Sequence, residues 1–424
     1  MSATRRALLG SGLVAGATAL LVGCDGDAPP RGDSTPSPRA AFDPQDWDSV
    51  RDQFLLDPEL AQLAAFVLSP HTAALQEAID GYREELATDT EAALLKGIER
   101  EDAVRSEAAA YAGGEPDQYA LTDSTTMGIA SMYGGLELTA GDEVLTTTHD
   151  FYSTEASLDL LARRTGAKIK RVALYDDPAA ATVDEMVARL VTGVGPRTRV
   201  VAVTWVHSST GVRLPIPEMS AALADAGRRS GTRALFCVDG VHGFGAVDVD
   251  LPDLGCDFLA TGTHKWLFGP RGTGILWARD WKPLTELIPT FSGPDGGGRR
   301  LTPGGYQAFE HQWAAADAFA LMGRIGRDRT AARTTEQATQ LKEGLADVGG
   351  LTLITPASPE VSAGIVCIEV PPGMLPGDAV VALRDRGIVA SATPYAVSYL
   401  RLGPSIATTP EQVDAAVAAV AELV

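Results

Sequence analysis

The apolar and polar positions in the middle of the chain follow two alternating patterns. Between Glu143 and Ala278, short apolar runs are separated by stretches with helical periodicity. The apolar runs are "EVLTT", "KIKRVAL", "RVVAVTWV", "ALFCVD", "DFLAT" and "GILWA". Runs of this length predict buried strands, and strands that alternate with helices predict βαβ units. We therefore expect an α/β fold in which helices cover both faces of a mainly parallel sheet.

Helical periodicity dominates the segments on either side of this region. It runs from about residue 58 to residue 111, with breaks near residues 69 and 88, and again from about 313 to 348. The apolar spacing in both segments is typical of helices with one buried face.

The end of the chain mixes short strands with helices. The apolar runs "GIVCIEV" and "YLRLG" are each followed by a helical pattern, beginning at about Pro376 and Pro410. This order predicts a small α+β domain. We expect a large domain over residues 45–310, whose first helices could also belong to the smaller one, and a small C-terminal domain over residues 311–424.

The amino terminus has the layout of an export signal. Arg5 and Arg6 precede an apolar run that ends at "LVGC", and the run is too short to span a membrane stably. We expect a signal peptide over residues 1–23 and a flexible tether, rich in Pro, Gly, Asp and Ser, over residues 24–44. "LVGC" resembles a bacterial lipobox, which would lipidate Cys24 and anchor the exported chain on the cell-envelope or periplasmic side. The alternative is a cytoplasmic protein with an apolar amino-terminal helix.

Composition narrows the range of partners. The 424 residues are 45% hydrophobic, which is enough for a large core, and the formal net charge is −20. An acidic surface repels phosphate backbones, so nucleic acid is not expected as a partner. Cys237, Cys256 and Cys367 are odd in number and lack paired spacing. We expect buried free thiols, with neither a disulfide framework nor a metal site.

One lysine occupies an unusual position in this pattern. Lys265 lies in "TGTHKWLFGPRGTGILW", between two apolar runs that predict buried strands. An amine held between core strands loses hydration, which lowers its pKa and makes it a nucleophile. Schiff-base chemistry requires such an amine.

A carboxylate follows the preceding predicted strand. "ALFCVDGVHGFG" ends a strand in Asp239, and Lys265 follows the next strand along the chain. Ligands bind at the carboxyl ends of strands in open parallel sheets, so we expect the two side chains to lie close together. Taken alone, Asp239 could equally cap a helix or bind a metal.

Six motifs occur in a characteristic order: "DSTTMG", "TTHDFYST", "HSSTG", "VDGVHGFG", "THKWLFGPRGTG" and "LRLGPS". They span residues 122–405, and as an ordered set they resemble the class V aminotransferase family of pyridoxal-phosphate enzymes, in particular its isopenicillin N epimerase-like branch. The resemblance implies fold type I, a pyridoxal 5'-phosphate cofactor and a homodimer. It implies that Lys265 bonds to the cofactor and then transfers protons on the substrate, that Asp239 keeps the ring nitrogen protonated, and that His242 lies beside the ring hydroxyl.

The cofactor phosphate needs hydroxyl groups and free amides. Ser124, Thr125 and Thr126 begin a predicted helix, whose amino terminus favours an anion. Read alone, this motif would be an ordinary helix cap. The resemblance adds His264 and Thr263 to the phosphate site, although the family often has a hydroxyl residue where this chain has Gly262.

An aromatic side chain normally covers one face of the cofactor ring in this family. "THDFYST" offers His149, Phe151 and Tyr152, and Phe151 fits the family position best. Each of the three could instead pack in the core.

Two further residues are expected at the substrate. Arg401 matches the family's carboxylate-binding arginine, with a surface salt bridge as the alternative, and His207 follows a strand that points at the site. A Gly-Thr pair commonly reaches the neighbouring subunit's phosphate in this family. This chain has Gln312 and Trp313 there, which puts that contact in doubt.

The expected activity is on the α-carbon of an amino acid or an amine-bearing peptide. Transamination, epimerisation and β-elimination stay open, because the same ring and lysine serve all of them. Cysteine desulfuration is excluded because no cysteine lies near Arg401 in the sequence and Cys367 falls in an apolar strand. A tethered lipoprotein that only binds a ligand would not need Lys265, so that alternative is disfavoured.

Overall fold

The computed structural model describes residues 42–231, 233–291 and 296–424. Residues 42–424 form one compact unit. The expected signal peptide, Cys24 and the expected tether as far as residue 41 lie outside the described residues.

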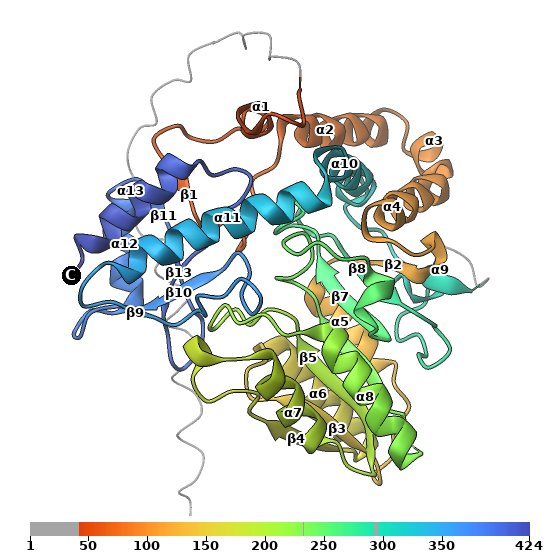
Figure 1. The fold of residues 1–424 in the computed structure, drawn as a ribbon. Coiled ribbons are helices and arrows are strands. Elements are labelled where there is room, and N and C mark those ends of the chain that lie inside the picture. Colours follow the sequence, from red (N-terminus) through yellow and green to blue (C-terminus); the bar gives the residue numbers. More distant parts are fainter. Residues whose placement is uncertain (1–41, 232, 292–295) are drawn as a thin grey trace, which may run out of the picture. The chain divides into compact units, whose positions relative to one another are not determined.

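A seven-stranded sheet forms the centre of this unit (Figure 1). Its strand order is β2-β8-β7-β6-β5-β3-β4. The strands are β2 (Tyr119–Thr122), β3 (Glu143–Thr147), β4 (Lys168–Val172), β5 (Thr198–Thr204), β6 (Leu235–Asp239), β7 (Phe258–Gly262) and β8 (Gly274–Ala278). Only β8 runs antiparallel to its neighbours, β2 and β7. The expected α/β fold with a mainly parallel sheet is confirmed.

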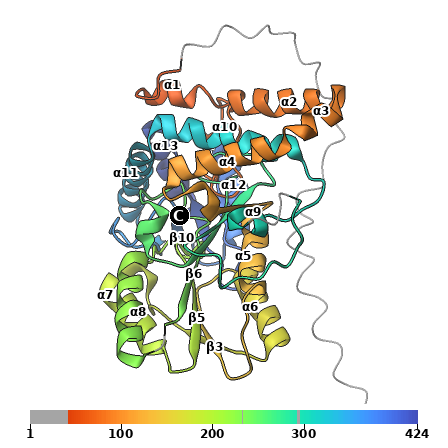
Figure 2. The ribbon, with the colours of Figure 1, turned by 90° about the vertical axis from the view of Figure 1, so that its right-hand side faces the viewer.

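Helices cover both faces of this sheet. Figure 2 shows α5 (Thr125–Gly134) and α6 (Tyr152–Thr165) on one side and α7 (Val183–Gly193) and α8 (Ile216–Ser230) on the other. Alternate residues of β5 point to opposite faces of the sheet. Val200 and Ala202 belong to one hydrophobic cluster, and Val201 and Val203 belong to the other. Strands buried on both faces need continuous apolar runs, which explains the pattern in the sequence.

The segments before and after the sheet pack on one another. Helices α2 (Ala73–Thr88) and α4 (Gly97–Ala112) contact α10 (Phe309–Ile325). The expected domain boundary after residue 310 therefore falls inside a helix. The other α-helices before the sheet are α1 (Trp47–Arg51) and α3 (Thr90–Leu95).

A second, smaller sheet lies in the C-terminal part. Its order is β12-β13-β10-β9, and all three pairings are antiparallel. Its strands are β9 (Thr352–Leu353), β10 (Val366–Glu369), β12 (Ser391–Ala392) and β13 (Leu400–Leu402), and its helices are α11 (Arg327–Ala346), α12 (Pro376–Arg384) and α13 (Pro410–Ala421).

Two details of the helical expectations are wrong. Residues 58–69 contain no helix; instead β1 (Ala61–Gln62) pairs with β11 (Ile388–Val389) in parallel. Backbone pairing with a distant strand overrides the local periodicity here. The stretch from 313 to 348 is also interrupted, because Gly326 has a φ of 98° and separates α10 from α11.

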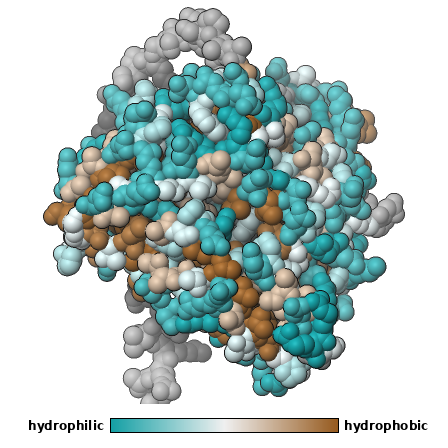
Figure 3. Space-filling view, viewed as in Figure 1, coloured by the Kyte–Doolittle hydropathy of each residue, from teal (hydrophilic) through white to brown (hydrophobic). Residues whose placement is uncertain are grey.

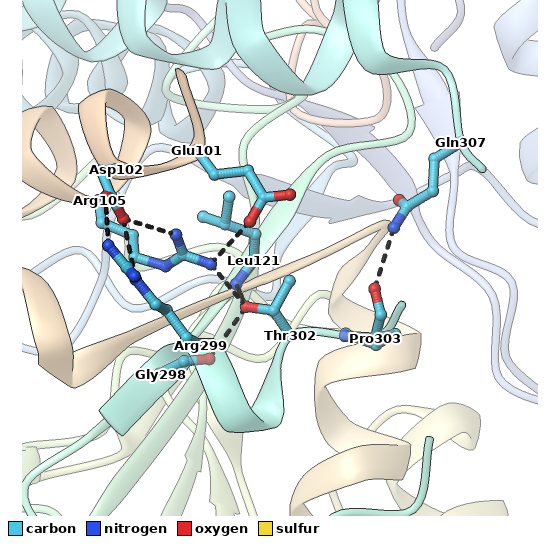
Figure 4. Close-up of polar contacts among 9 residues, drawn as sticks. All are labelled: Glu101, Asp102, Arg105, Leu121, Gly298, Arg299, Thr302, Pro303 and Gln307. Carbon is cyan, nitrogen blue, oxygen red and sulfur yellow. Dashed lines mark hydrogen bonds and ion pairs between the residues drawn. The ribbon is translucent and has the colours of Figure 1, made fainter. Parts of the chain in front are cut away.

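The edge strand β2 is covered by the segment after α9 (Gly297–Leu301) (Figure 4). The Thr302 hydroxyl accepts hydrogen bonds from the Leu121 amide at 3.0 Å and the Arg105 guanidinium at 3.1 Å, and it donates to the Gly298 carbonyl at 2.9 Å. Covering an edge strand prevents pairing with other chains. It also fixes β2 just before the turn that carries Ser124.

The face of the molecule seen in Figure 1 mixes a mostly hydrophilic surface with smaller hydrophobic areas (Figure 3). Among the described residues, none of the helices is both long enough and apolar enough to span a membrane.

Candidate active site

A pocket lies at the carboxyl ends of β5, β6 and β7. Nine of the residues expected at the site line it: Ser124, Thr125, Thr126, Phe151, Asp239, His242, His264, Lys265 and Arg401. His207 and Thr263 do not line it. Segments that are nearly 300 residues apart in the sequence, from Ser124 to Arg401, therefore meet at one place.

Lys265 lies three residues after the end of β7. Burial lowers the pKa of its amine to about 8, while Asp239 acts in the opposite direction and Arg401 in the same direction. Its Nζ lies 3.4 Å from His242 Nε2. The amine is therefore largely desolvated and weakly hydrogen-bonded, which favours nucleophilic attack on an aldehyde.

Asp239 is the last residue of β6 and is 1% exposed. Burial raises the pKa of its carboxyl to about 6, against a hydrogen bond from the Val241 amide and the charge of Lys265. A buried carboxylate that binds so few donors is suited to a cationic partner.

His242 lies in the turn after β6 and is buried. Burial lowers the pKa of its imidazole well below the usual value, and the charge of Lys265 adds to this effect. Its Nδ1 is buried and has no hydrogen-bond partner. The neutral ring can thus donate or accept one further hydrogen bond inside the pocket.

The residues expected to bind the cofactor phosphate lie at the amino terminus of α5. Ser124 is the N-cap and accepts a hydrogen bond from the Met127 amide at 3.2 Å, so the capping alternative is met in the structure. Its hydroxyl proton can still donate to a ligand. Thr125 Oγ1 is buried without a partner. The helix terminus and this hydroxyl together suit an anion.

The position of His264 explains why this chain has Gly262 where the family often has a hydroxyl residue. A Cβ at Gly262 would lie 2.6 Å from His264 Cε1 and 3.1 Å from Thr125 Oγ1. The imidazole of His264 thus fills the space that a side chain at position 262 would need. Thr263 is buried instead, where its hydroxyl hydrogen-bonds that of Thr273.

The three aromatic candidates separate clearly in space. His149 stacks on Tyr175 with ring centroids 4.0 Å apart, and Tyr152 is 65% exposed. Phe151 lines the pocket. Of the three, Phe151 alone has a position suited to cover a cofactor ring.

Arg401 is a residue of β13 and is 7% exposed. Its Nε donates to Ser391 Oγ at 3.2 Å, and its two Nη atoms donate to the carbonyls of Ser208 and Ala392. Three of its five N–H groups are used in this way, which leaves one on each terminal nitrogen. Two such donors suit a carboxylate held by both oxygens.

His207 differs from the expectation. It is fully buried, with Nδ1 2.8 Å from the Tyr175 hydroxyl, and burial lowers its pKa well below the usual value. The next residue, Ser208, lines the pocket, and its hydroxyl bonds that of Tyr395 at 2.7 Å. The motif reaches the site through Ser208.

Six pocket residues were not among the residues expected at the site: Phe66, Val67, Ser153, Thr204, Val241 and Pro394. Ser153 and Val241 adjoin expected residues and could have been inferred by adjacency. Phe66 and Val67 come from a segment for which a helix was expected, so nothing local marked them.

Gln312 and Trp313 are core residues of α10. Both are buried, and the Trp313 ring stacks on Phe309 with 5.4 Å between centroids. The guanidinium carbon of Arg100 lies 4.4 Å from the Trp313 ring centroid. Packing within the subunit accounts for the Trp313 ring, whereas Gln312 Oε1 and Trp313 Nε1 are buried without a hydrogen-bond partner.

The three cysteines in the described residues are free and buried, as expected. Cys367 lies opposite Arg401 in the β10–β13 pairing, and burial raises the pKa of its thiol to about 12. None of these thiols lines the pocket. Within the described part of the chain, no three His, Cys, Asp or Glu side chains group as a metal site.

These residues fit pyridoxal phosphate. The helix α5 terminus and the unpartnered Thr125 hydroxyl suit its phosphate, Asp239 suits the ring nitrogen, and His242 offers a free nitrogen for the ring hydroxyl. Phe151 could cover the ring, and Lys265 supplies the amine. Each group on the cofactor thus has a chemically matched residue.

Comparisons with known proteins agree with this chemistry. Residues 98–415 match the family described as Aminotransferase class-V. The isopenicillin N epimerase of Streptomyces clavuligerus is 30% identical over 393 residues, covering 87% of this chain and 96% of that protein. A cysteine desulfurase of Klebsiella pneumoniae is 30% identical over 269 residues, covering 60% and 62%. A structure of a C-DES mutant with glycine covalently linked to its PLP cofactor has a TM-score of 0.80 at 21% identity, covering 88% of this chain and 99% of that one.

Proposed function

The chain belongs to the class V aminotransferase family of pyridoxal-phosphate enzymes, and from this premise we propose that it acts on the α-carbon of an amino acid or an amine-bearing peptide. The observation that supports the proposal most is that Lys265, Asp239 and Arg401 line the same pocket. An amine, a buried carboxylate and a carboxylate-binding guanidinium are the three groups that this chemistry requires of the protein.

Each residue has a distinct task in this proposal. The cofactor, when bound, supplies an electron sink that stabilises negative charge on the substrate α-carbon. Asp239 holds a proton on the ring nitrogen by its negative charge. Lys265 Nζ binds the cofactor covalently at rest, and during turnover it removes a proton at the α-carbon and returns one. His242 offers its unpartnered Nδ1 to the ring hydroxyl of the cofactor.

The substrate carboxylate is assigned to Arg401. One N–H on each of its terminal nitrogens stays available, so it can hold both carboxylate oxygens and fix the α-carbon relative to Lys265. A peptide with a free amine fits this site if its carboxylate occupies the same position.

The type of α-carbon reaction is limited by what the pocket contains. Cysteine desulfuration needs a reactive thiol at the substrate, and among the described residues no cysteine lines the pocket. The proposal therefore covers transamination, epimerisation and β-elimination, which all begin with removal of the proton from the α-carbon.

The proposal is tested with purified protein that lacks residues 1–24. We expect a yellow protein, and borohydride reduction followed by peptide mass mapping should label Lys265. Amino acids and peptides are then screened by the absorption of the bound cofactor, and those that respond are incubated in D₂O. Incorporation of deuterium at the α-carbon is the expected result. Colourless protein that takes up no added cofactor would instead support a ligand-binding lipoprotein.

We also propose that the chain is exported and lipid-anchored at Cys24, as Arg5, Arg6 and "LVGC" suggest. Mass spectrometry of the amino terminus after expression in a native-like host should find Cys24 first and lipidated. An unprocessed amino terminus at Met1 would contradict this.

Homodimer formation is a further part of the proposal. Phe291 and Tyr306 are 70% and 83% exposed, with ring centroids 6.4 Å apart, and large exposed apolar side chains favour contact with another chain. Light scattering after gel filtration should give twice the mass of one chain.

A further inference from the structure

A short segment near the start of the described chain connects the two ends of the active site. We call residues 63–69 the connecting segment. At one end, the Leu63 carbonyl accepts a hydrogen bond from the Gly403 amide at 2.7 Å, two residues after Arg401. At the other end, the Ser69 amide donates to the His264 carbonyl at 3.0 Å, next to Lys265. The segment therefore bonds to the backbone beside both functional residues.

Phe66 and Val67 are the residues of this segment that line the pocket, and Phe66 is the one that also contacts Arg401. Its side chain is fully buried and lines the pocket wall. The guanidinium carbon of Arg401 lies 5.2 Å from the centre of its ring. Trp266 stacks on the ring at 6.1 Å, and His242 meets its edge at the same distance. One aromatic ring thus contacts residues of the Lys265 turn, the Asp239 turn and the Arg401 strand.

The contact with Arg401 has a physical consequence. A cation over an aromatic face is held by the negative charge of that face, and more strongly where water is excluded. The hydrogen bonds to Ser391, Ser208 and Ala392 use one N–H of each guanidinium nitrogen and do not cover the face of the group. The ring of Phe66 holds the plane of the Arg401 guanidinium in place. It thereby fixes the direction of the two remaining N–H groups.

The ring itself has little freedom to move. A Cβ placed on Gly403 would lie 2.5 Å from Phe66 Cδ1, so the backbone of Gly403 packs directly on the ring. With Trp266 on the ring and Gly403 beside it, its orientation is fixed by close packing.

We propose that Phe66 is a positioning residue that holds the Arg401 guanidinium in place for the substrate carboxylate. This inference rests on the proposed function, in which Arg401 binds that carboxylate. It assigns to Phe66 a role in recognising the carboxylate and none in the chemical step.

The test compares Phe66→Met, which keeps the apolar volume but removes the aromatic face, with Phe66→Tyr, which keeps the face. The probes are three amino acids, glycine, L-alanine and L-glutamate, and their decarboxylated partners methylamine, ethylamine and 4-aminobutyrate, titrated by the absorption of the bound cofactor. We expect Phe66→Met to weaken binding of the responding amino acids by about tenfold. Binding of the amines should change less than twofold, and Phe66→Tyr should stay close to wild type.

Two controls separate positioning from a structural role. Phe319→Met removes an equally buried aromatic ring from the core of α10 and should leave both kinds of probe unchanged. In a double-mutant cycle with Arg401→Lys, Phe66→Met should have little further effect on amino-acid binding, because the group that it positions is already gone.

The outcomes are distinguishable. Equal weakening of amino acids and amines by Phe66→Met would overturn the inference, since it would show a general structural role. A wild-type protein that shows no preference for any of the three amino acids over its amine would overturn it as well. Failure of the proposed function itself would appear earlier, as wild-type protein without a cofactor on Lys265. Gly403→Ala, which displaces the ring from its other side, should reproduce the selective loss if Phe66→Met folds poorly.

Discussion

Two regions of this protein each hold a lysine with a largely desolvated amine, and the two amines differ in their hydrogen bonds. Lys265 lies in the turn after β7, and Lys342 lies inside α11 and is 3% exposed. In both cases burial is the main cause that lowers the pKa of the amine to about 8. By its pKa alone, neither lysine would be distinguished from the other.

The hydrogen bonds make the distinction. Lys342 Nζ donates to the carbonyls of Pro356 and Ala357 at 3.1 and 2.8 Å and to Ser362 Oγ at 2.8 Å, which uses all three of its protons. Lys265 Nζ has one long contact, to His242 Nε2 at 3.4 Å. A saturated amine is held in place, whereas an unsaturated one can react with a ligand. Desolvation prepares a lysine for catalysis only where its donors are left free.

The matched pair Lys265→Met and Lys342→Met gives the largest expected difference. Lys265→Met removes both the covalent attachment and the proton-transferring amine, so turnover should fall by at least about 10³-fold. Lys342→Met should retain turnover within about threefold, because its amine does not reach the pocket. Both are measured by initial rates on the same substrate with cofactor added in excess.

A comparable loss of turnover in both variants at equal folded fraction would contradict the distinction. Borohydride labelling supplies an independent check, since it should mark Lys265 in the Lys342→Met protein and leave Lys342 unlabelled in the Lys265→Met protein.

For folding stability we expect the opposite ranking: Lys342→Met should be the more damaging of the two substitutions. Lys342→Met removes the donor from the buried Pro356 carbonyl and Ser362 hydroxyl and from the carbonyl of the exposed Ala357, which should lower the free energy of unfolding by about 2–4 kcal/mol. Lys265→Met breaks one long contact and replaces a desolvated amine with an apolar group, so the cofactor-free protein should be as stable as wild type or more so. Chemical denaturation of the cofactor-free proteins checks this. Equal destabilisation by both substitutions would show that Lys265 is also held structurally.

The sequence predicted the burial and reactivity of Lys265 but gave no indication that Lys342 is buried, and the reason is physical. The surroundings of Lys265 are local: the two strands that desolvate it flank it within about ten residues, and Asp239 ends the preceding strand. The acceptors of Lys342 lie in a loop after β9, and no periodicity in α11 indicates that this loop folds back onto the helix. A sequence motif indicates the chemistry of residues that lie close together along the chain. Contacts between distant parts of the backbone produce no such motif.

The same limit applies within the site. Phe66 was unpredictable because parallel pairing of β1 with β11, over 300 residues away, determines the course of its segment. His207 was expected at the pocket, but the turn after β5 presents Ser208 there and buries His207 against Tyr175. The mainly parallel sheet with helices on both faces did follow from the sequence, because strands covered on both faces are apolar along their whole length.

Asp239 is the charge that distinguishes the Lys265 region, and its removal should alter how stability depends on pH. The folded protein raises its pKa from 3.8 to about 6, so it binds this proton more tightly than the unfolded chain does. The stabilisation is complete below pH 3.8 and is lost as the pH rises through 6. The cofactor-free wild type should therefore lose about 2 kcal/mol of folding stability relative to Asp239→Asn between pH 4 and 7. Parallel unfolding curves for the two proteins would contradict this.

The smallest expected effect is on the pH dependence of cofactor attachment. Only the neutral amine attacks an aldehyde, so the rate at which cofactor-free protein bonds to pyridoxal phosphate should rise with pH and level off above a midpoint near 8. Asp239 favours the charged amine, so Asp239→Asn should move the midpoint to lower pH, whereas Lys342→Met should leave it unchanged. Stopped-flow absorbance between pH 6 and 10 measures all three. A midpoint near 10.5 in the wild type would mean that water reaches Lys265 freely. The difference between Lys265 and Lys342 would then depend on their hydrogen bonds alone.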